Sequence, residues 1–316
     1  MPVSSLKTGV ISPNSLLAGN NAFDPFATAR GLFAGGSTGA AVSNVIDYIE
    51  IATTGNATDF GDLSVARMDL GGVSSTTRGV FGGGENYAQN VFYNTLDYVT
   101  IATTGNATDF GDLTVNYSYQ PGSCSSSTRG LFGGGYNGSL ILTIDYITIA
   151  TTGNGTNFGD LSQSRRGLRG CSSPTRGLFA GGYNGSFLNT IDYVIIATTG
   201  NAADFGDLTV GRYNLAGCSS STRGIILGGN GGAADLNVID YVTIASTGNA
   251  IDFGDLSVAR AGAATSSSVR GVLAGGSGMN TIDYVTIATL GNATDFGDLN
   301  ENKHLAAGVS SGHGGL

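Results

Sequence analysis

The chain repeats one pattern six times, and this repetition restricts the folds that it can adopt. Each copy begins with an Arg-Gly step, an apolar run and a glycine doublet. The arginines are Arg30, Arg78, Arg129, Arg176, Arg223 and Arg270, with a mean spacing of 48 residues. Each copy continues with Asp-Tyr, Gly-Asn and Phe-Gly-Asp, and 13 residues separate the Asp of Asp-Tyr from this Phe in every copy. A period of this size, built from short β-type segments, indicates a propeller or a solenoid.

The copy that includes Arg223 shows four segments with strand character. Residues 215–221 are small, 225–229 are an apolar run, 238–245 are β-branched and aromatic, and 250–258 carry a Phe and a Leu. Such residues suit a pleated, packed surface, and no window shows the apolar periodicity of a helix. Four antiparallel strands per copy, here named a to d, predict an all-β fold, a six-bladed β-propeller.

The position of each strand in a blade predicts its residue types. Strand a lies at the centre, where six copies converge and only Ala, Gly, Ser, Cys or Val are expected to fit. Cys124, Cys171 and Cys218 recur at one position of this strand, so buried thiols are a better interpretation than a disulfide framework. The Phe and Leu of strand d are expected to pack between neighbouring blades.

The ends of the repeat region predict how the ring closes. Residues 305–316 repeat the strand-a pattern without a strand b after them, and the first copy begins directly at strand b. The C-terminal segment is therefore expected to supply strand a to the first blade, which leaves no free sheet edge. In the alternative, residues 21–28 supply this strand.

We divide the chain into an N-terminal arm, 1–29, and a propeller, 30–316. The arm lies outside the repeat and contains three of the five prolines. It is expected to be either a tether or a disordered leader. It lacks the pattern of a secretory signal, and no apolar stretch is long enough to predict insertion into a membrane.

Most charged residues occupy template positions, by which we mean positions that recur across the copies. Seventeen of the 23 carboxylates and 11 of the 14 basic residues do so, and the net charge of −9 follows mainly from this repetition. No cluster of Lys and Arg is available to neutralise phosphates, which argues against nucleic acid as a partner.

Two charged template positions are expected to be structural. The Asp of Asp-Tyr lies in an apolar strand, where an unpaired charge is unfavourable. We therefore expect it to accept hydrogen bonds from backbone groups or from a template arginine. The clearest members are the acids Asp97, Asp145, Asp192 and Asp240 and the bases Arg78, Arg129, Arg176 and Arg223.

Residues suited to catalysis or metal binding are scarce. The two histidines, His304 and His313, have no partners at metal-ligand spacing. Acidic pairs such as Asp59 and Asp62 fall short of a calcium site, and the serine runs recur in every copy without a base. The sequence therefore predicts no enzyme, no cofactor and no metal.

Sequence variation between copies is concentrated in the b–c and d–a loops. In a blade of four antiparallel strands these loops share one face, and repeat proteins often bind partners where loops vary. The candidate binding residues on this face are Tyr87, Phe92, Tyr93, Tyr117, Tyr119, Tyr136, Asn137, Tyr183, Asn184, Phe187 and Tyr213. Exposed tyrosines beside Asn and Gly would suit a glycan or a protein; the alternative is that these rings only pack on neighbouring blades.

The order of these elements resembles the kelch repeat. A glycine doublet follows an apolar strand, a strand with a tyrosine comes next, then an aromatic residue, and an arginine precedes the next small-residue strand, over residues 30–316. The kelch tryptophan is absent, and a phenylalanine stands in its place. These are Phe60, Phe110, Phe158, Phe205, Phe253 and Phe296.

The amino-acid sequence of the copies is also similar to repeats in virion-associated proteins of tailed phages, notably those of cyanobacteria and marine bacteria. It runs Ile-Asp-Tyr-Val-Thr-Ile-Ala-Thr-Thr-Gly-Asn-Ala-Thr-Asp-Phe-Gly-Asp-Leu, with small changes between copies. The resemblance implies a structural or adhesion module of a virion, such as part of a tail fibre, assembled in the host cytoplasm. Its arm would contact other virion proteins, and its variable loops would bind a glycan or protein of the host surface. The alternative is a bacterial carbohydrate-binding or scaffolding propeller.

Overall fold

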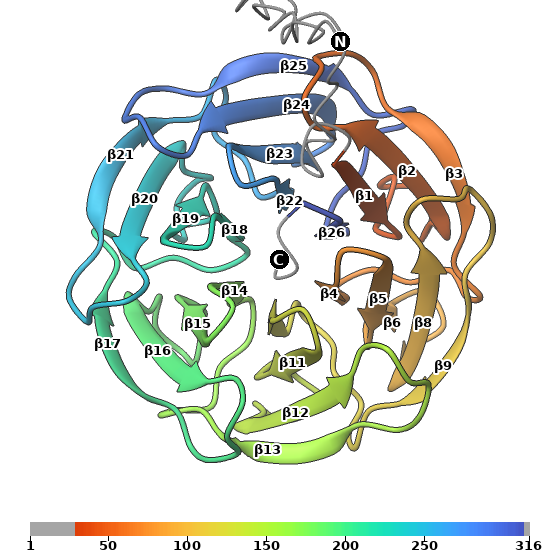
Figure 1. Ribbon diagram of the computed structural model, residues 1–316, viewed down its shortest axis with the longest axis horizontal. Helices are drawn as coiled ribbons and strands as arrows, with labels where there is room; N and C mark the ends of the chain where they lie inside the picture. Colours follow the sequence, from red (N-terminus) through yellow and green to blue (C-terminus); the bar gives the residue numbers. More distant parts are fainter. Residues whose placement is uncertain (1–28, 313–316) are drawn as a thin grey trace, which may run out of the picture.

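The computed structural model describes residues 29–312, and these form a ring of six β-sheets (Figure 1). Each sheet has four antiparallel strands, and no helix occurs among the described residues. The prediction of an all-β, six-bladed β-propeller is therefore confirmed. The division at residue 29 stays a prediction, because residues 1–28 lie outside the described part of the chain.

The blades repeat one order of strands from the axis outward. The innermost strands, a, are β26 (Ala307–Ser310), β4 (Gly71–Ser74), β10 (Gly122–Ser125), β14 (Arg169–Ser172), β18 (Ala216–Ser219) and β22 (Ala263–Ser266). Strands b are β1 (Arg30–Ala34), β5 (Arg78–Gly82), β11 (Arg129–Gly133), β15 (Arg176–Ala180), β19 (Arg223–Leu227) and β23 (Arg270–Gly276). Strands c are β2 (Val45–Glu50), β8 (Thr95–Thr100), β12 (Thr143–Thr148), β16 (Thr190–Ile195), β20 (Val238–Thr243) and β24 (Met279–Thr286). The outermost strands, d, are β3 (Thr58–Asp62), β9 (Thr108–Asp112), β13 (Thr156–Asp160), β17 (Ala203–Asp207), β21 (Ile251–Asp255) and β25 (Thr294–Asp298).

The ring closes through the C-terminal strand. Strand β26 pairs antiparallel with β1, with Leu32 opposite Val309, and so completes the first blade (Figure 1). Closure by the C-terminal segment is therefore confirmed. The competing segment, 21–28, lies outside the described residues.

Aromatic residues of strand d join neighbouring blades, as predicted. Phe60 of β3 is buried and packs with Val99 and Ile101 of the second blade. Its ring also meets the edge of Tyr48, at a centroid distance of 6.0 Å. The same Tyr–Phe contact recurs within every blade. The packing of each strand-d Phe on the following blade holds one sheet to the next.

The template aspartates are buried, and five of the six form ion pairs with bases of the preceding d–a loop. The Arg165 guanidinium lies 3.1 Å from Asp192, and both side chains are inaccessible to solvent. Ser162 donates its hydroxyl and its backbone N–H to the same carboxylate. Four other blades repeat the pair: Arg67–Asp97, Arg212–Asp240, Arg260–Asp283 and Lys303–Asp47. The predicted hydrogen bonding of the aspartates is confirmed, and the arginine is the one before strand a.

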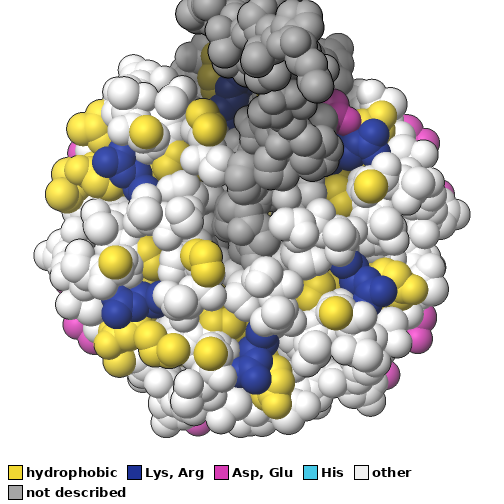
Figure 2. Space-filling model, in the orientation of Figure 1, with side chains coloured by type: hydrophobic (Ala, Val, Ile, Leu, Met, Phe, Trp, Pro, Cys, Tyr) yellow, Lys and Arg dark blue, Asp and Glu magenta, His cyan; other side chains and the backbone are white. Residues whose placement is uncertain are grey.

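The Arg-Gly arginines have a different role. The Arg129 guanidinium lies 4.3 Å from the ring centroid of Tyr146 and donates to the carbonyl oxygen of Ile196 in the following blade, at 2.9 Å. All six arginines stack on the tyrosine of their own blade in this way. Apart from Arg166, the other described Lys and Arg side chains are buried. The basic side chains spaced around the face in Figure 2 are therefore these arginines.

The glycine doublets turn the chain sharply after strand b. The first glycine of each pair has φ between 55° and 72° and the second between 95° and 112°. A Cβ on Gly36 would lie 2.5 Å from the carbonyl oxygen of His304 in the neighbouring d–a loop. Only glycine combines this backbone conformation with so close an approach. The doublet thereby brings the b–c loops against the d–a loops on one face.

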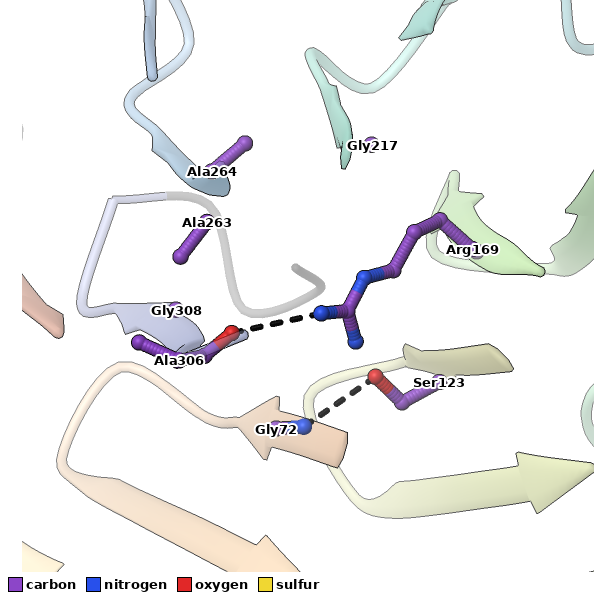
Figure 3. A pocket seen from close by; sticks show the side chains of 9 residues that line it. Gly72, Ser123, Arg169, Gly217, Ala263, Ala264, Ala306 and Gly308 are labelled. Carbon is purple, nitrogen blue, oxygen red and sulfur yellow. Dashed lines mark hydrogen bonds between the residues drawn. The ribbon is translucent and has the colours of Figure 1, made fainter. Parts of the chain in front are cut away.

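The predicted limit on side-chain size at the axis is wrong at Arg169, and Thr265 of β22 also lies outside the expected residue types, although it is small. Arg169 begins β14, where the other five blades have Gly or Ala, and its buried side chain extends into the channel (Figure 3). Its three guanidinium nitrogens donate to the carbonyl oxygens of Leu215, Leu70 and Ala306. Because the opposing residues are small, the channel has room for one large side chain, provided that its charge is hydrogen-bonded.

Candidate functional site

Five d–a loops meet around the axis on the face that also carries the b–c loops, which we call the variable face. Each of the five places at least one residue in the left-handed backbone region. These residues are Leu305, Asp69, Gln120, Gly167 and Asn214, and the loop of Gln120 also places Tyr119 there. Backbone hydrogen bonds link the loops, for example from Asp69 N to Leu305 O and from Gln120 N to Asp69 O. The loops therefore form a connected rim.

A cavity of about 230 Å³ opens at this rim, and we call it the mouth cavity. Its walls come from five of the six d–a loops and from the b–c loop of the second blade. Polar and aromatic side chains predominate among them: Asp69, Glu85, Tyr87, Tyr119, Arg166 and Tyr213. The b–c loop contributes a hairpin of β6 (Glu85–Asn86) and β7 (Val91–Phe92), which backbone hydrogen bonds between Met68 and Glu85 attach to the neighbouring d–a loop. The cavity thus lies where the least repetitive parts of the chain converge.

The charged residues that depart from the template gather here. Arg166 and Arg169 are the only described basic residues outside template positions, and both belong to the fourth blade's d–a loop and strand a. Asp69 and Glu85 are two of the few carboxylates outside the template. Because repetition does not explain these residues, their convergence indicates a specific site.

Asp69 is the most perturbed acid of the site. It is 2% exposed, and its Oδ2 atom has no hydrogen-bond partner among the described residues. Burial raises the pKa of Asp69 to about 8, and the nearby charge of Glu85 acts in the same direction. Arg169 and Arg166 oppose this shift. A carboxyl group with so few partners is poised to accept hydrogen bonds from a ligand.

Glu85 is buried beside Asp69 but has one partner. Burial raises its pKa, while the Ser118 hydroxyl, which donates to Oε2 at 2.8 Å, and the charge of Arg166 lower it. Beneath the mouth, burial lowers the pKa of Arg169 to about 10, and the charge of Asp69 opposes this shift. The side chain of Arg169 reaches across the channel toward Ala306 (Figure 3). The floor of the site is therefore closed by a cation whose hydrogen bonds go to the protein.

Most of the predicted aromatic residues form one arc on the variable face. Tyr119 and Phe92 contact Tyr136 edge to face, with centroids 5.5 and 6.3 Å apart. Tyr183, Phe187 and Tyr213 form a second cluster, with centroid distances of 5.3 to 5.9 Å.

Arg166 joins these two clusters. Its guanidinium lies 4.6 Å from the ring centroid of Tyr119, 5.4 Å from that of Tyr136 and 5.7 Å from that of Tyr183. Cation–π attraction of this kind holds the rings and the guanidinium in place. The aromatic arc and the mouth cavity are thus continuous.

The remaining predicted residues lie in different places. Tyr87 is exposed beside the mouth cavity, and Asn137 and Asn184 are exposed in b–c turns farther along the variable face. Tyr93 is half-buried, and its carbonyl accepts the Tyr117 N–H.

The expectation that Tyr117 is exposed is wrong. It is fully buried at the position where most blades have the arginine that pairs with the template Asp, next to Asp145. In this blade the Thr114 hydroxyl and backbone N–H donate to Asp145, as Ser162 does to Asp192, but no arginine is added. Burial raises the pKa of Asp145. Tyr117 therefore belongs to the interior of the propeller.

Sequence reasoning missed the polar part of the site. The missed residues are Asp69, Glu85, Gln120, Arg166, Arg169 and Asn214. Their departure from the template could have identified these residues in the sequence. The clearest case is Arg169, a charged residue at a position of strand a that is Gly or Ala in the other copies.

The pKa of Asp69 predicts how stability depends on pH. The folded protein keeps this proton up to about pH 8, whereas an unfolded Asp loses it near pH 4, so the folded state binds more protons in between. Stability should therefore fall as the pH rises from about 4 to about 8. Glu85 and Asp145, whose pKa values are also raised, act in the same direction.

Asp69→Asn should remove the largest part of this loss, and asparagine tolerates the left-handed φ of 59°. We expect the variant to be more stable than the parent by about 2 kcal/mol or more at pH 8 and nearly equal at pH 4. Urea unfolding at the two pH values measures this. Equal stability of the two proteins at both values would contradict the assignment.

Comparisons with known proteins add no family. Neither a scan against protein-family models nor a search of curated proteins found a match. Within residues 29–312, no group of three or more His, Cys, Asp or Glu side chains could hold a metal ion. The described residues also form no helix that could span a membrane.

Proposed function

We propose that this protein is a non-enzymatic binding module that presents its variable face to a glycan or a protein. The observation that carries the proposal is the aromatic arc beside the mouth cavity. Rigid rings with polar groups around them supply contact area at a small loss of side-chain entropy, as in other recognition surfaces. The template face, formed by the a–b and c–d turns, repeats similar contacts from blade to blade. Its cavities, of about 210 and 190 Å³, lie at c–d turns and are lined mainly by template residues.

We further propose that the module is a kelch-like structural or adhesion component of a phage virion, for example of a tail fibre. The resemblance of the repeat sequence to repeats of phage virion proteins supports this, and so does the concentration of non-template residues on one face. In this proposal residues 1–29 attach the propeller to other virion proteins, and the variable face contacts the host surface. A bacterial carbohydrate-binding or scaffolding propeller is the alternative, and the same aromatic arc would serve it.

Binding to host cells tests the adhesion proposal. The purified protein should co-sediment with cells of a susceptible bacterium, and the double variant Tyr119→Ala/Tyr213→Ala should lose at least about tenfold in affinity. Tyr119 and Tyr213 come from different clusters of the arc, so the variant removes contacts on both sides of Arg166.

A matched control lies on the opposite face. Leu290 is 58% exposed in a c–d turn, and Leu290→Ala should bind as the parent does. Equal binding by the double variant would show that the arc is not the contact surface. Sedimentation with virions but not with cells would favour an architectural role over adhesion.

A further inference from the structure

The mouth cavity contains two buried carboxylates that lack a cationic partner. Asp69 and Glu85 are 2% and 3% exposed, yet neither forms an ion pair with any residue of the described chain. Five of the six template aspartates, which are equally buried, do have such a pair. Buried charges in proteins are normally paired, because an unpaired one is strongly disfavoured. Within the described residues, these two carboxylates therefore lack the direct ion pair that most template aspartates have.

The two nearby arginines are committed elsewhere. Arg169 directs its guanidinium to three backbone carbonyls across the channel. Arg166 lies over the ring of Tyr119 and among those of Tyr136 and Tyr183. Both lower the pKa of Asp69 at a distance, but neither contacts the carboxylate. Oδ2 of Asp69 has no hydrogen-bond partner among the described residues, so it retains its capacity to accept a donor from a ligand that enters the mouth cavity.

The backbone holds the two acids in place before any ligand arrives. Asp69 is fixed in a left-handed conformation by hydrogen bonds to the d–a loops on both sides. Glu85 is fixed by its two backbone hydrogen bonds to Met68, the residue before Asp69. Tyr87, Tyr119 and Tyr213 supply aromatic walls, which favour a cation through their ring faces. Such preorganisation reduces the entropy lost on binding.

We propose that the mouth cavity binds a primary ammonium group of the ligand, between the carboxylates of Asp69 and Glu85. This names the chemistry of the partner and rests on the proposed binding role of the variable face. The ammonium group could belong to an amino sugar or to a lysine side chain, and both would place the same charge against the same carboxylates. A cation favours the ionised form of Asp69, so its binding releases a proton near neutral pH.

Calorimetry with small probes tests the proposal on the full chain. Nα-acetyl-lysine amide should bind at pH 8 with at least about tenfold higher affinity than its Nε-acetylated form, which has no charge. Glucosamine and N-acetylglucosamine, compared at pH 6.5, form the second arm. The charged lysine probe is also measured at pH 6.5, and the charged probe that binds more tightly at this common pH identifies the source of the ammonium group.

Variants locate the site. Asp69→Asn and Glu85→Gln should each reduce the affinity for the charged probe by about tenfold or more. Asp235→Asn is the matched control, because Asp235 lies in a b–c loop of the same face and already accepts hydrogen bonds from Asn230 and Ser277. Its affinity should be unchanged. Thermal melting of each variant confirms that it is folded.

The dependence on pH gives a readout that a merely structural role would not produce. Affinity for the lysine probe should rise between about pH 6 and pH 8, because Asp69 loses its proton in this range. The other titratable or charged groups around Asp69 are Glu85, Arg166, Arg169 and Tyr119. Asp69→Asn should flatten this profile.

Equal affinity for charged and acetylated probes, no binding of either charged probe, or unchanged binding by the acid variants would overturn the proposal. Binding to cells that persists in these cases would leave the proposed function intact. Probe binding without binding to cells would contradict the adhesion role alone.

Discussion

Asp192→Ala should lower the free energy of unfolding by about 3–5 kcal/mol, because it leaves the Arg165 guanidinium buried and unpaired. The same substitution deprives the Ser162 hydroxyl and backbone N–H of their acceptor. Arg165 also donates to the carbonyl of Phe179, but one carbonyl cannot replace a carboxylate. Denaturant unfolding followed by circular dichroism measures the change.

The control for this variant lies directly opposite in the same sheet. Asp204 of β17 is paired with Asp192 of β16 and is exposed to solvent. Asp204→Ala should change stability by no more than about 0.5 kcal/mol. A similar effect of the two substitutions would mean that the buried ion pair adds nothing beyond strand propensity.

Arg169→Ala should destabilise the protein by about 3 kcal/mol, because three backbone carbonyls at the axis lose a charged donor. These carbonyls belong to the segments that lead into β18, β4 and β26, so one side chain connects four of the six innermost strands. Arg169→Lys should fall between the parent and Arg169→Ala, since an ammonium group cannot present the fork of donors that reaches three acceptors.

Arg166, three residues earlier, provides the comparison. Its guanidinium contacts only aromatic rings of the described chain, and Arg166→Ala should cost about 1 kcal/mol or less. If Arg169→Ala melts at the temperature of the parent, water has replaced the guanidinium and the side chain is not needed to hold the channel.

The repeated part of the fold could be predicted from the sequence because each copy gives the same information. Six occurrences of Phe-Gly-Asp and Asp-Tyr at constant spacing fix the strand order, the interblade packing of residues such as Phe60 and the burial of the aspartates. The sequence did not decide which template arginine pairs with Asp192. Both Arg165 and Arg176 recur in the pattern, and only the path of the d–a loop places Arg165 next to the carboxylate.

The candidate site could be predicted only in part. Aromatic residues of the loops were recognised by composition, but the rim depends on left-handed backbone conformations at residues such as Asp69 and Gln120, which local propensity does not specify. Tyr117 shows the opposite error. It lies among variable loop residues in the sequence, yet it takes the position of a buried arginine. The sequence of a single copy does not specify the contacts that its loops make with loops of other blades, so these contacts could not be predicted.

The pairing of β26 with β1 has a consequence for how the molecule is made. The blade that is synthesised first, β1 to β3, receives its innermost strand from residues translated almost at the end of the described chain. During translation this sheet has an open inner edge, which can pair with other extended chains until β26 emerges. The native ring can therefore close only after β26 has been synthesised. A chain truncated before β26 would keep this open edge, and we expect it to aggregate rather than to form a smaller closed ring.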